Sequence, residues 1–160
     1  MFRTTVLAFI ASLPVSACAT SPGFDADPRL KAAQEQNATV VVAVTEMELP
    51  SGSAYRSQFF RDVGLVESTI ANEDGFLGMS KRVEPFGRRA WTLTVWEDRG
   101  AMAQFMYSPD HAAAVERSRK EAWSARFVDF EMPASDLPAP WKEMLVKLDE
   151  KGRTRVSKGR

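Results

Sequence analysis

The stretch WTLTVWEDRGAMAQFMYSPDH, residues 91–111, decides the fold because it joins a strand to the starts of two helices. Residues 91–96 place large side chains on both faces of a β-strand, so neither face is suited to water. Asp98 is positioned to cap a first helix. The letters SPD at 108–110 are three consecutive helix-start signals: a capping serine, a proline in the first helical position and an acid in the first turn. This second helix is predicted to run to about Ala122.

The segments on either side complete one domain. They are rich in β-branched residues where a strand is expected, or carry apolar residues at steps of three and four where a helix is expected. The sequence predicts strands over 39–49, 73–84, 88–98 and 125–132, a helix over 54–72 and a short terminal helix within 137–150.

This order of elements is the split βαβ pattern of ferredoxin-like folds. We therefore predict an α+β domain over residues 38–150, with βαββαβ order, a four-stranded antiparallel sheet and helices on one face. The second face of the sheet then needs cover, because neither side of strand 91–96 is suited to water. A partner subunit is the simplest source of that cover, so the sequence predicts a homodimer.

The amino end has the layout of an export signal. Residues 1–17 contain one Arg, a short apolar run and small residues before Cys18. The letters VSAC resemble the bacterial lipobox, in which the cysteine is lipid-modified and the signal is cleaved before it. The resemblance implies a membrane anchor through lipid on Cys18, in the bacterial cell envelope. Ala19 after it implies the outer membrane, facing the periplasm. The alternatives are an ordinary secretory signal with a coincidental cysteine, or a buried thiol.

Two terminal segments lack a core pattern. Residues 18–37 mix Pro, Gly, Ser and charges, which predicts a lipidated flexible tether. Residues 151–160 are basic and predict a disordered tail. A solvated terminus is the simpler reading of that tail, and a nucleic-acid or phospholipid role is the alternative.

Composition limits the classes of partner. The chain is 44% hydrophobic and 26% charged, with a formal net charge of zero, which is typical of one globular domain. With no overall basic field, we expect no nucleic-acid partner. One Cys and one His leave few ligands for a transition metal, so no metal site is predicted.

Two motifs carry a family resemblance. The letters GFLGM at 75–79, followed by residues 91–117, resemble the antibiotic biosynthesis monooxygenase-like, dimeric α/β-barrel superfamily. The likeness covers about residues 38–132. It implies a ferredoxin-like subunit that assembles as a dimeric α/β barrel. It also implies a range of activities, from cofactor-independent oxygenation of aromatic compounds to haem degradation.

The haem-degrading branch can be compared position by position. It uses an Asn on the first strand, a Trp in the helix after TVW and a His in the next helix. The matching positions here hold Thr45, Phe105 and Val115. The resemblance therefore disfavours haem cleavage and implies no cofactor, although haem stays an alternative planar ligand.

His111 is the only histidine and the candidate catalytic residue. It lies near a predicted helix N-terminus, whose positive dipole end disfavours the imidazolium. A neutral imidazole could act as a base toward a phenolic or enolic substrate. The alternative is a partly buried histidine that serves packing, because no second catalytic group is fixed near it by spacing.

Four aromatic residues are candidates for the wall of a ligand pocket: Trp96, Phe105, Tyr107 and Trp123. The alternative is that they form ordinary core. The first function hypothesis is a lipid-anchored periplasmic monooxygenase-like domain that oxidises a small aromatic or quinone-like substrate without a cofactor. The second is a non-catalytic binding or sensing module for a planar apolar ligand such as haem. A third is a structural unit of the envelope.

Overall fold

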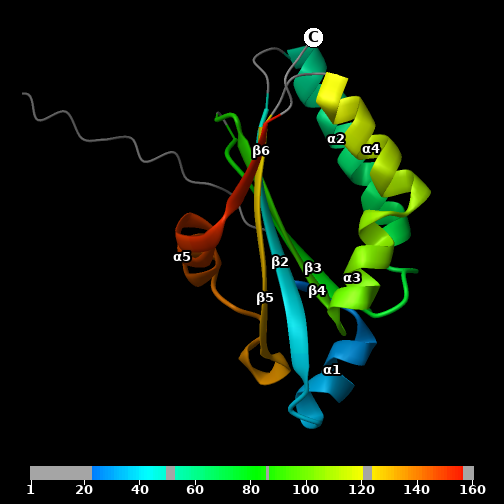
Figure 1. The fold of residues 1–160 in the computed structure, drawn as a ribbon, viewed down its shortest axis with the longest axis vertical. Helices are drawn as coiled ribbons and strands as arrows, with labels where there is room; N and C mark the ends of the chain where they lie inside the picture. The colour runs from blue at the N-terminus through cyan, green and yellow to red at the C-terminus, as the bar shows by residue number, and fades with distance from the viewer. Residues whose placement is uncertain (1–22, 50–52, 86, 121–123, 157–160) are drawn as a thin grey trace, which may run out of the picture.

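The computed structural model describes residues 23–49, 53–85, 87–120 and 124–156. Within these ranges the chain forms one six-stranded sheet and five α-helices that pack on it (Figure 1). In chain order the elements are β1 Asp25–Ala26, α1 Pro28–Glu35, β2 Thr39–Glu48, α2 Ser53–Ile70, β3 Phe76–Val83, β4 Arg89–Trp96, α3 Arg99–Met106, α4 Pro109–Lys120, β5 Ser124–Pro133, the short 3₁₀ helix η1 Ala134–Asp136, α5 Trp141–Lys151 and β6 Arg153–Val156.

The sheet confirms the predicted fold class. Its strand order is β1-β3-β4-β2-β5-β6, and every neighbouring pair is antiparallel. The inner four strands, with α2 and the α3–α4 pair between them, give the βαββαβ order of a ferredoxin-like domain. The prediction of a four-stranded sheet was wrong in one respect, because β1 and β6 add one strand at each edge.

The central strand β2 explains why the sheet forms where it does. Residues 40–44 are four valines and one alanine, and β-branched side chains suit a pleated surface that is buried on both sides. β4 lies on one side of β2 and β5 on the other, with Val44 opposite Leu93 and Val128. The strand is therefore buried by its neighbours and by both layers of helices.

The helices form two layers, one on each face of the sheet (Figure 1). The prediction of helices on one face was therefore wrong, because α5 packs on the face opposite α2, α3 and α4. We call the face covered by α2, α3 and α4 the α2 face, and the opposite face the α5 face. Val41 and Met47 of β2 contribute to the core of the α2 face, whereas Val40, Val42 and Val44 contribute to the α5 face. This alternation follows from the two-residue period of a strand.

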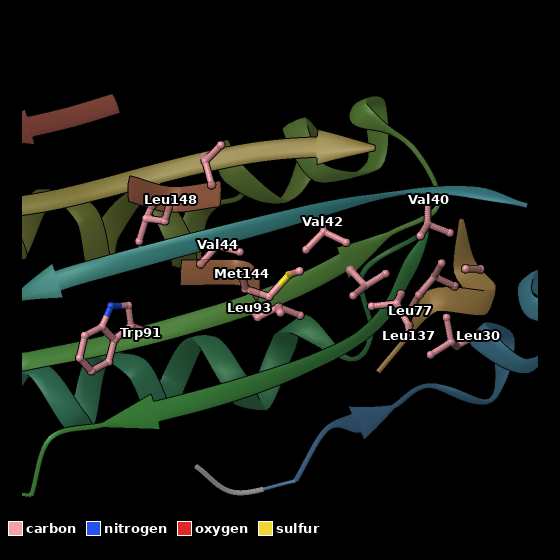
Figure 2. Packing of buried hydrophobic residues seen from close by; sticks show 13 residues of the cluster. Leu30, Val40, Val42, Val44, Leu77, Trp91, Leu93, Leu137, Met144 and Leu148 are labelled. Atoms are coloured by element: carbon pink, nitrogen blue, oxygen red, sulfur yellow. The ribbon is translucent and has the colours of Figure 1, made fainter. Parts of the chain in front are cut away.

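The larger buried cluster lies on the α5 face (Figure 2). Met144 and Leu148 of α5 are fully buried against the sheet. The cluster consists of Leu30, Val40, Val42, Val44, Leu77, Trp91, Leu93, Val95, Val128, Ala134, Leu137, Met144 and Leu148. The terminal helix therefore supplies cover that the sequence assigned to a partner subunit. The homodimer stays a prediction.

The segment before β2 differs from the expected flexible tether. Asp27 caps α1 by accepting a hydrogen bond from the Arg29 backbone nitrogen at 2.9 Å, and Pro28 occupies the first turn. Leu30 is buried in the α5-face cluster. The helix is only eight residues long, so one inward leucine does not produce a recognisable period. Residues 18–22 of the expected tether lie outside the described residues.

The end of the chain differs from the expected disordered tail in a similar way. Residues 153–156 form β6, which pairs with β5 so that Arg153 lies opposite Phe127. The Arg153 guanidinium lies over the Phe127 ring, 4.8 Å from its centroid. This short segment, two of whose four residues are arginines, forms an edge strand because its backbone pairs with β5, and such pairing needs no apolar pattern in the sequence. Residues 157–160 lie outside the described part.

The second glycine of the GFLGM motif, Gly78, is required by the backbone at that position. Gly78 has φ 155°, and a Cβ atom there would meet the Phe24 ring at 2.7 Å and the Asp25 carbonyl oxygen at 2.8 Å. The register between β3 and β4 shifts at this point. Gly78 therefore forms a β-bulge that lets β1 lie against β3.

Within the described ranges, no helix is long and apolar enough to cross a membrane. The predicted signal segment 1–17 and the predicted lipidation site Cys18 lie outside those ranges. The lipid anchor therefore stays a prediction.

Candidate functional site

A pocket of about 250 Å³ lies between α2 and the α2 face of the sheet. Helix α2 forms one wall, and β2, β3 and β4 form the other. Its apolar lining comes from Met47, Phe59, Phe60, Val63, Val83 and Ala90. Trp91, Thr92 and one acid–base pair, Glu67 and Lys81, complete it. A cavity of about 150 Å³ holds one benzene ring, so this pocket has room for a molecule of one or two rings.

The pocket wall on α2 follows from helical spacing. Phe59, Val63 and Glu67 are four residues apart, so their side chains lie on one face of the helix. The same face continues to the buried Ile70. Glu67 is thus a carboxylate on an otherwise apolar stripe.

The strand wall contains a matching cation. On β3, Met79, Lys81 and Val83 alternate toward the α2 face, so a lysine stands where an apolar residue is expected. Lys81 lies directly opposite Thr92 of β4. The ammonium, the hydroxyl and the Glu67 carboxylate therefore occupy the same part of the pocket.

The Glu67 carboxylate is only half satisfied. Lys81 Nζ donates to Oε2 at 2.7 Å. Oε1 is buried and has no hydrogen-bond donor among the described residues. An unpaired buried acceptor is unfavourable by roughly 1–3 kcal/mol, so this oxygen would gain from a donor that reaches it.

Arg56 holds the pocket wall in place. Its Nη1 donates to the Gly87 carbonyl at 2.7 Å, and its Nη2 donates to the Glu84 and Pro85 carbonyls at 3.1 and 3.2 Å. Its guanidinium also lies 5.6 Å from the centroid of the Phe60 ring. The start of α2 is thereby tied to the turn between β3 and β4.

His111 lies elsewhere, at the start of α4. Its ring is 4.7 Å from the Phe105 ring, and its Nδ1–H donates to the Met106 carbonyl at 2.9 Å. Burial lowers the pKa of His111, an effect that the hydrogen bond to Met106 partly opposes. His111 is not among the residues that line the α2–sheet pocket. The lowered pKa favours the neutral imidazole, and the contacts of the ring are with Phe105 and the backbone of Met106. Its catalytic role stays a prediction.

The four predicted pocket aromatics separate in the structure. Trp96 and Phe105 stack at 5.0 Å between centroids in the core of the α2 face, and Phe76 meets Trp96 edge-on at 5.5 Å. Trp96 Nε1 donates to Thr94 Oγ1 at 3.0 Å. Tyr107 is 84% exposed. None of the three lines the described pocket, and their ligand role stays a prediction. Trp123 lies outside the described residues.

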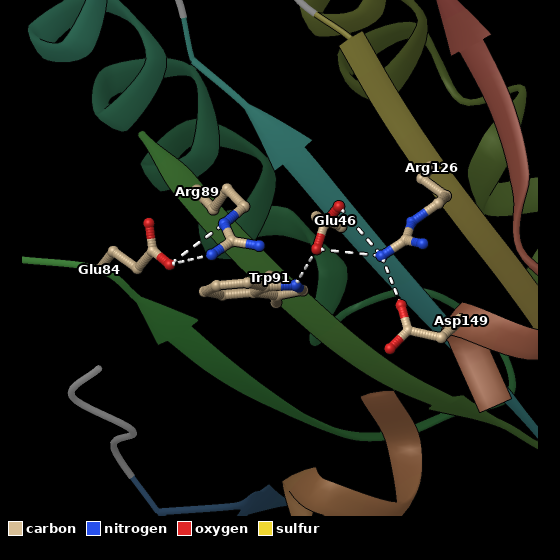
Figure 3. Close-up of polar contacts among 6 residues, drawn as sticks. All are labelled: Glu46, Glu84, Arg89, Trp91, Arg126 and Asp149. Atoms are coloured by element: carbon tan, nitrogen blue, oxygen red, sulfur yellow. Dashed lines mark hydrogen bonds and ion pairs between the residues drawn. The ribbon is translucent and has the colours of Figure 1, made fainter. Parts of the chain in front are cut away.

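A polar row closes one end of the α5 face (Figure 3). Trp91 Nε1 donates to Glu46 Oε2 at 2.8 Å, and Arg126 Nη2 lies 3.2 Å from Glu46 Oε1. Arg126 Nη2 also donates to Asp149 of α5 at 2.8 Å. Arg89 pairs with Glu84, and its guanidinium lies 5.5 Å from the centroid of the Trp91 ring. The row satisfies the polar atom of a buried tryptophan and joins α5 to the sheet.

Sequence reasoning missed Glu67 and Lys81. The signal was present, because each is a charged residue on the inward face of an otherwise apolar element. A single charged residue on an inward face does not by itself indicate a site. Glu67 of α2 and Lys81 of β3 come together only when the helix packs on the sheet. Within the described ranges, no three side chains of His, Cys, Asp or Glu gather as metal ligands.

A family model described as Domain of unknown function (DUF3291) matches residues 19–154. No curated protein matches the chain in sequence.

Comparison with solved structures supports the fold. SnoaB, a cofactor-independent oxygenase from Streptomyces nogalater, superposes with a TM-score of 0.52 and 16% identity over 62% of this chain and 97% of that chain. An uncharacterised ferredoxin-fold protein from Listeria monocytogenes, described as related to antibiotic biosynthesis monooxygenases, has a TM-score of 0.47 and 9% identity over 57% of this chain and 56% of that chain.

A third structure, a Lactobacillus acidophilus protein whose assignment as a monooxygenase is provisional, has a TM-score of 0.47 and 14% identity. The match covers 59% of this chain and 47% of that chain. The chain thus spans about half the length of the Lactobacillus and Listeria proteins. At 16% identity the likeness to SnoaB concerns the fold alone and does not extend to activity.

Proposed function

The chain belongs to the DUF3291 family, and we propose that its α2–sheet pocket binds a small aromatic or otherwise apolar molecule, which the domain oxidises without a cofactor. The observation that carries this proposal is the pocket itself: about 250 Å³, walled mainly by apolar side chains and provided with one carboxylate and one ammonium. A few polar groups in an apolar cleft are typical of small-molecule sites. The fold shared with SnoaB, a cofactor-independent oxygenase, is consistent with the proposed oxidation.

The pocket differs from the site that the sequence suggested. The proposed ligand contacts Phe59, Phe60 and Val63, and not Trp96, Phe105 or His111. Of the polar groups in the pocket, Glu67 is the one that can accept a proton, so it replaces His111 as the proposed acceptor. Without a cofactor to supply electrons, the substrate itself must reduce O₂, which favours an electron-rich aromatic compound.

Haem does not fit this pocket as a resident group. The volume of about 250 Å³ holds one or two rings, whereas a tetrapyrrole has four. The single histidine, the usual proximal ligand of haem iron, lies outside the pocket lining. These observations count against haem as the ligand of this pocket.

The cellular setting is proposed from the amino-terminal sequence. The export-type segment 1–17, followed by Cys18, supports a domain that is lipid-anchored in the outer membrane and faces the periplasm. There the domain would meet small molecules that cross the envelope. We also keep the homodimer as a proposal. It is supported by the resemblance of residues 75–79 and 91–117 to the dimeric α/β-barrel superfamily, and not by β4, whose two faces are covered by helices of the same chain.

The test begins with native mass spectrometry of the mature chain purified from its own periplasm, which reads subunit number and any co-purified molecule together. A bound aromatic compound of one or two rings is then supplied to the protein while O₂ uptake is recorded. Uptake that saturates with the compound, and that a pocket-filling variant such as Val63→Phe abolishes, supports the proposal.

Saturable binding at the pocket without O₂ uptake or product would contradict oxidation. That result would favour the second candidate function, a periplasmic carrier or sensor that uses the same pocket. The unpaired oxygen of Glu67 favours binding in either case, because a bound donor satisfies it whether or not the ligand is then oxidised.

A further inference from the structure

The Glu67 carboxylate presents one oxygen that the described chain leaves without a donor. Oε2 accepts from Lys81 at 2.7 Å, while Oε1 is buried and unpaired. Buried acceptors in folded proteins are nearly always satisfied by the chain, by water or by a ligand. Oε1 therefore points to something that the chain does not supply.

The surroundings of Oε1 narrow what that group can be. Glu67 lines a pocket whose other α2 residues are Phe59, Phe60 and Val63. A molecule that reaches Oε1 must therefore bury an apolar body against these side chains. The burial of that body is what allows its donor to compete with water for the carboxylate oxygen.

The polar groups of the pocket determine whether a ligand at Glu67 must carry a hydrogen-bond donor or an acceptor. Lys81 has only donors, and it is committed to the other oxygen of Glu67. An ionised carboxylate has only acceptors. Oε1 is buried in the structure, so the Glu67 side chain turns toward the pocket when a ligand binds. The unpaired oxygen then distinguishes ligands that carry an O–H or N–H from ligands of the same shape that do not.

From this arrangement, and resting on the proposed function of the pocket, we infer that Glu67 is a specificity-determining residue that selects a one- or two-ring apolar molecule bearing an O–H or N–H donor at its edge. The donor binds Oε1, and the rings lie between α2 and the sheet. Lys81 positions the carboxylate through Oε2. A hydrogen bond to a charged acceptor is strong enough to give at least about tenfold selectivity for the donor-bearing molecule.

The experiment uses two probes that differ only in the donor, 2-naphthol and 2-methoxynaphthalene. Their dissociation constants are measured by calorimetry for the mature chain and for Glu67→Gln and Glu67→Leu. Glu116→Leu, on the exposed side of α4, is the matched control. The unmodified chain and the control should bind 2-naphthol at least about tenfold more tightly than the ether.

Both variants should reduce the preference for 2-naphthol over 2-methoxynaphthalene, and Glu67→Leu should reduce it more than Glu67→Gln. Glu67→Gln keeps a neutral acceptor and should retain part of it, whereas Glu67→Leu should bind both probes within about threefold of each other. The affinity for 2-methoxynaphthalene should change little. Equal binding of both probes by the unmodified chain, with no effect of either variant, would overturn the role of Glu67 while leaving the pocket as a binding site. Failure of the unmodified chain to bind either probe would overturn the proposed pocket as well.

Discussion

Lys81 of β3 donates to Glu67 of α2 through a 2.7 Å contact, and this ion pair joins the helix to the sheet beside the pocket. The two residues are 14 positions apart in the chain and belong to different layers of the fold. Their pairing places one charged group of each sign in a site that is otherwise mainly apolar. The proposed function of the pocket depends on this arrangement.

Removing one partner of the pair should have unequal effects. Lys81→Met leaves a largely buried carboxylate without its donor and should lower the free energy of unfolding by about 1–3 kcal/mol. Glu67→Gln removes the buried charge and should change it by less than about 1 kcal/mol. The double variant should recover part of the loss, and urea unfolding measures all three. Strictly additive losses would contradict the coupling.

Filling the pocket should abolish ligand binding without unfolding the domain. In Val63→Phe the added ring enters existing space, so we expect a loss of at least tenfold in 2-naphthol affinity and a destabilisation below about 1 kcal/mol. Leu65→Phe, two residues along α2 at a site that is 59% exposed, is the control. Equal affinities of the two variants would place the ligand elsewhere.

His111 should make stability depend on pH. Burial holds its folded-state pKa below the value of 6.5 expected in the unfolded chain, so the unfolded chain binds a proton more readily. Stability should therefore fall as the pH drops below about 6.5 and level off once the folded state is protonated too. His111→Gln keeps a donor for Met106 but cannot titrate. The stability of that variant between pH 7 and 5 should be flatter than that of the unmodified chain, and parallel curves would show that His111 does not contribute.

Glu46 should be required for the polar row on the α5 face. Glu46→Ala leaves the indole N–H of the buried Trp91 unpaired and removes an acceptor from Arg126, so we expect a loss of about 2–3 kcal/mol. Glu46→Gln keeps an acceptor and should lose less. Glu48→Ala, which breaks only a pair between exposed side chains, should change stability by at most about 1 kcal/mol in thermal or urea unfolding.

Leu30 should behave as a core residue. Leu30→Ala removes a buried side chain from the α5-face cluster and should lower the free energy of unfolding by about 2–4 kcal/mol. The exposed neighbour Lys31 provides the control, since Lys31→Ala should be nearly neutral. A neutral Leu30→Ala would mean that residues 28–35 behave as the tether expected from sequence.

The periodic parts of the sequence predicted the fold well. The valines of β2 and the SPD start of α4 each gave a local signal strong enough to place an element within a few residues. Short elements escaped because their stability comes from distant contacts: α1 depends on burying Leu30, and β6 depends on pairing with β5. Two edge strands were therefore missing from the predicted sheet.

The candidate site was harder to predict than the fold. His111 attracted attention as a unique residue, and its lowered pKa agrees with the expected neutral form, yet its partners are Phe105 and the backbone of Met106. Glu67 and Lys81 form a pair only because α2 packs against β3 in the folded domain. Spacing along the chain cannot show a pair that depends on tertiary packing.

The most direct test of the central claim is methyl NMR of the mature chain during titration with 2-naphthol, which reports where the ligand binds. We expect saturable shifts at Met47, Val63 and Val83, which line the pocket, and little change at Val146 on the exposed side of α5. Shifts that leave these three residues unchanged, or an absence of saturable shifts, would contradict the proposal that the α2–sheet pocket is the binding site.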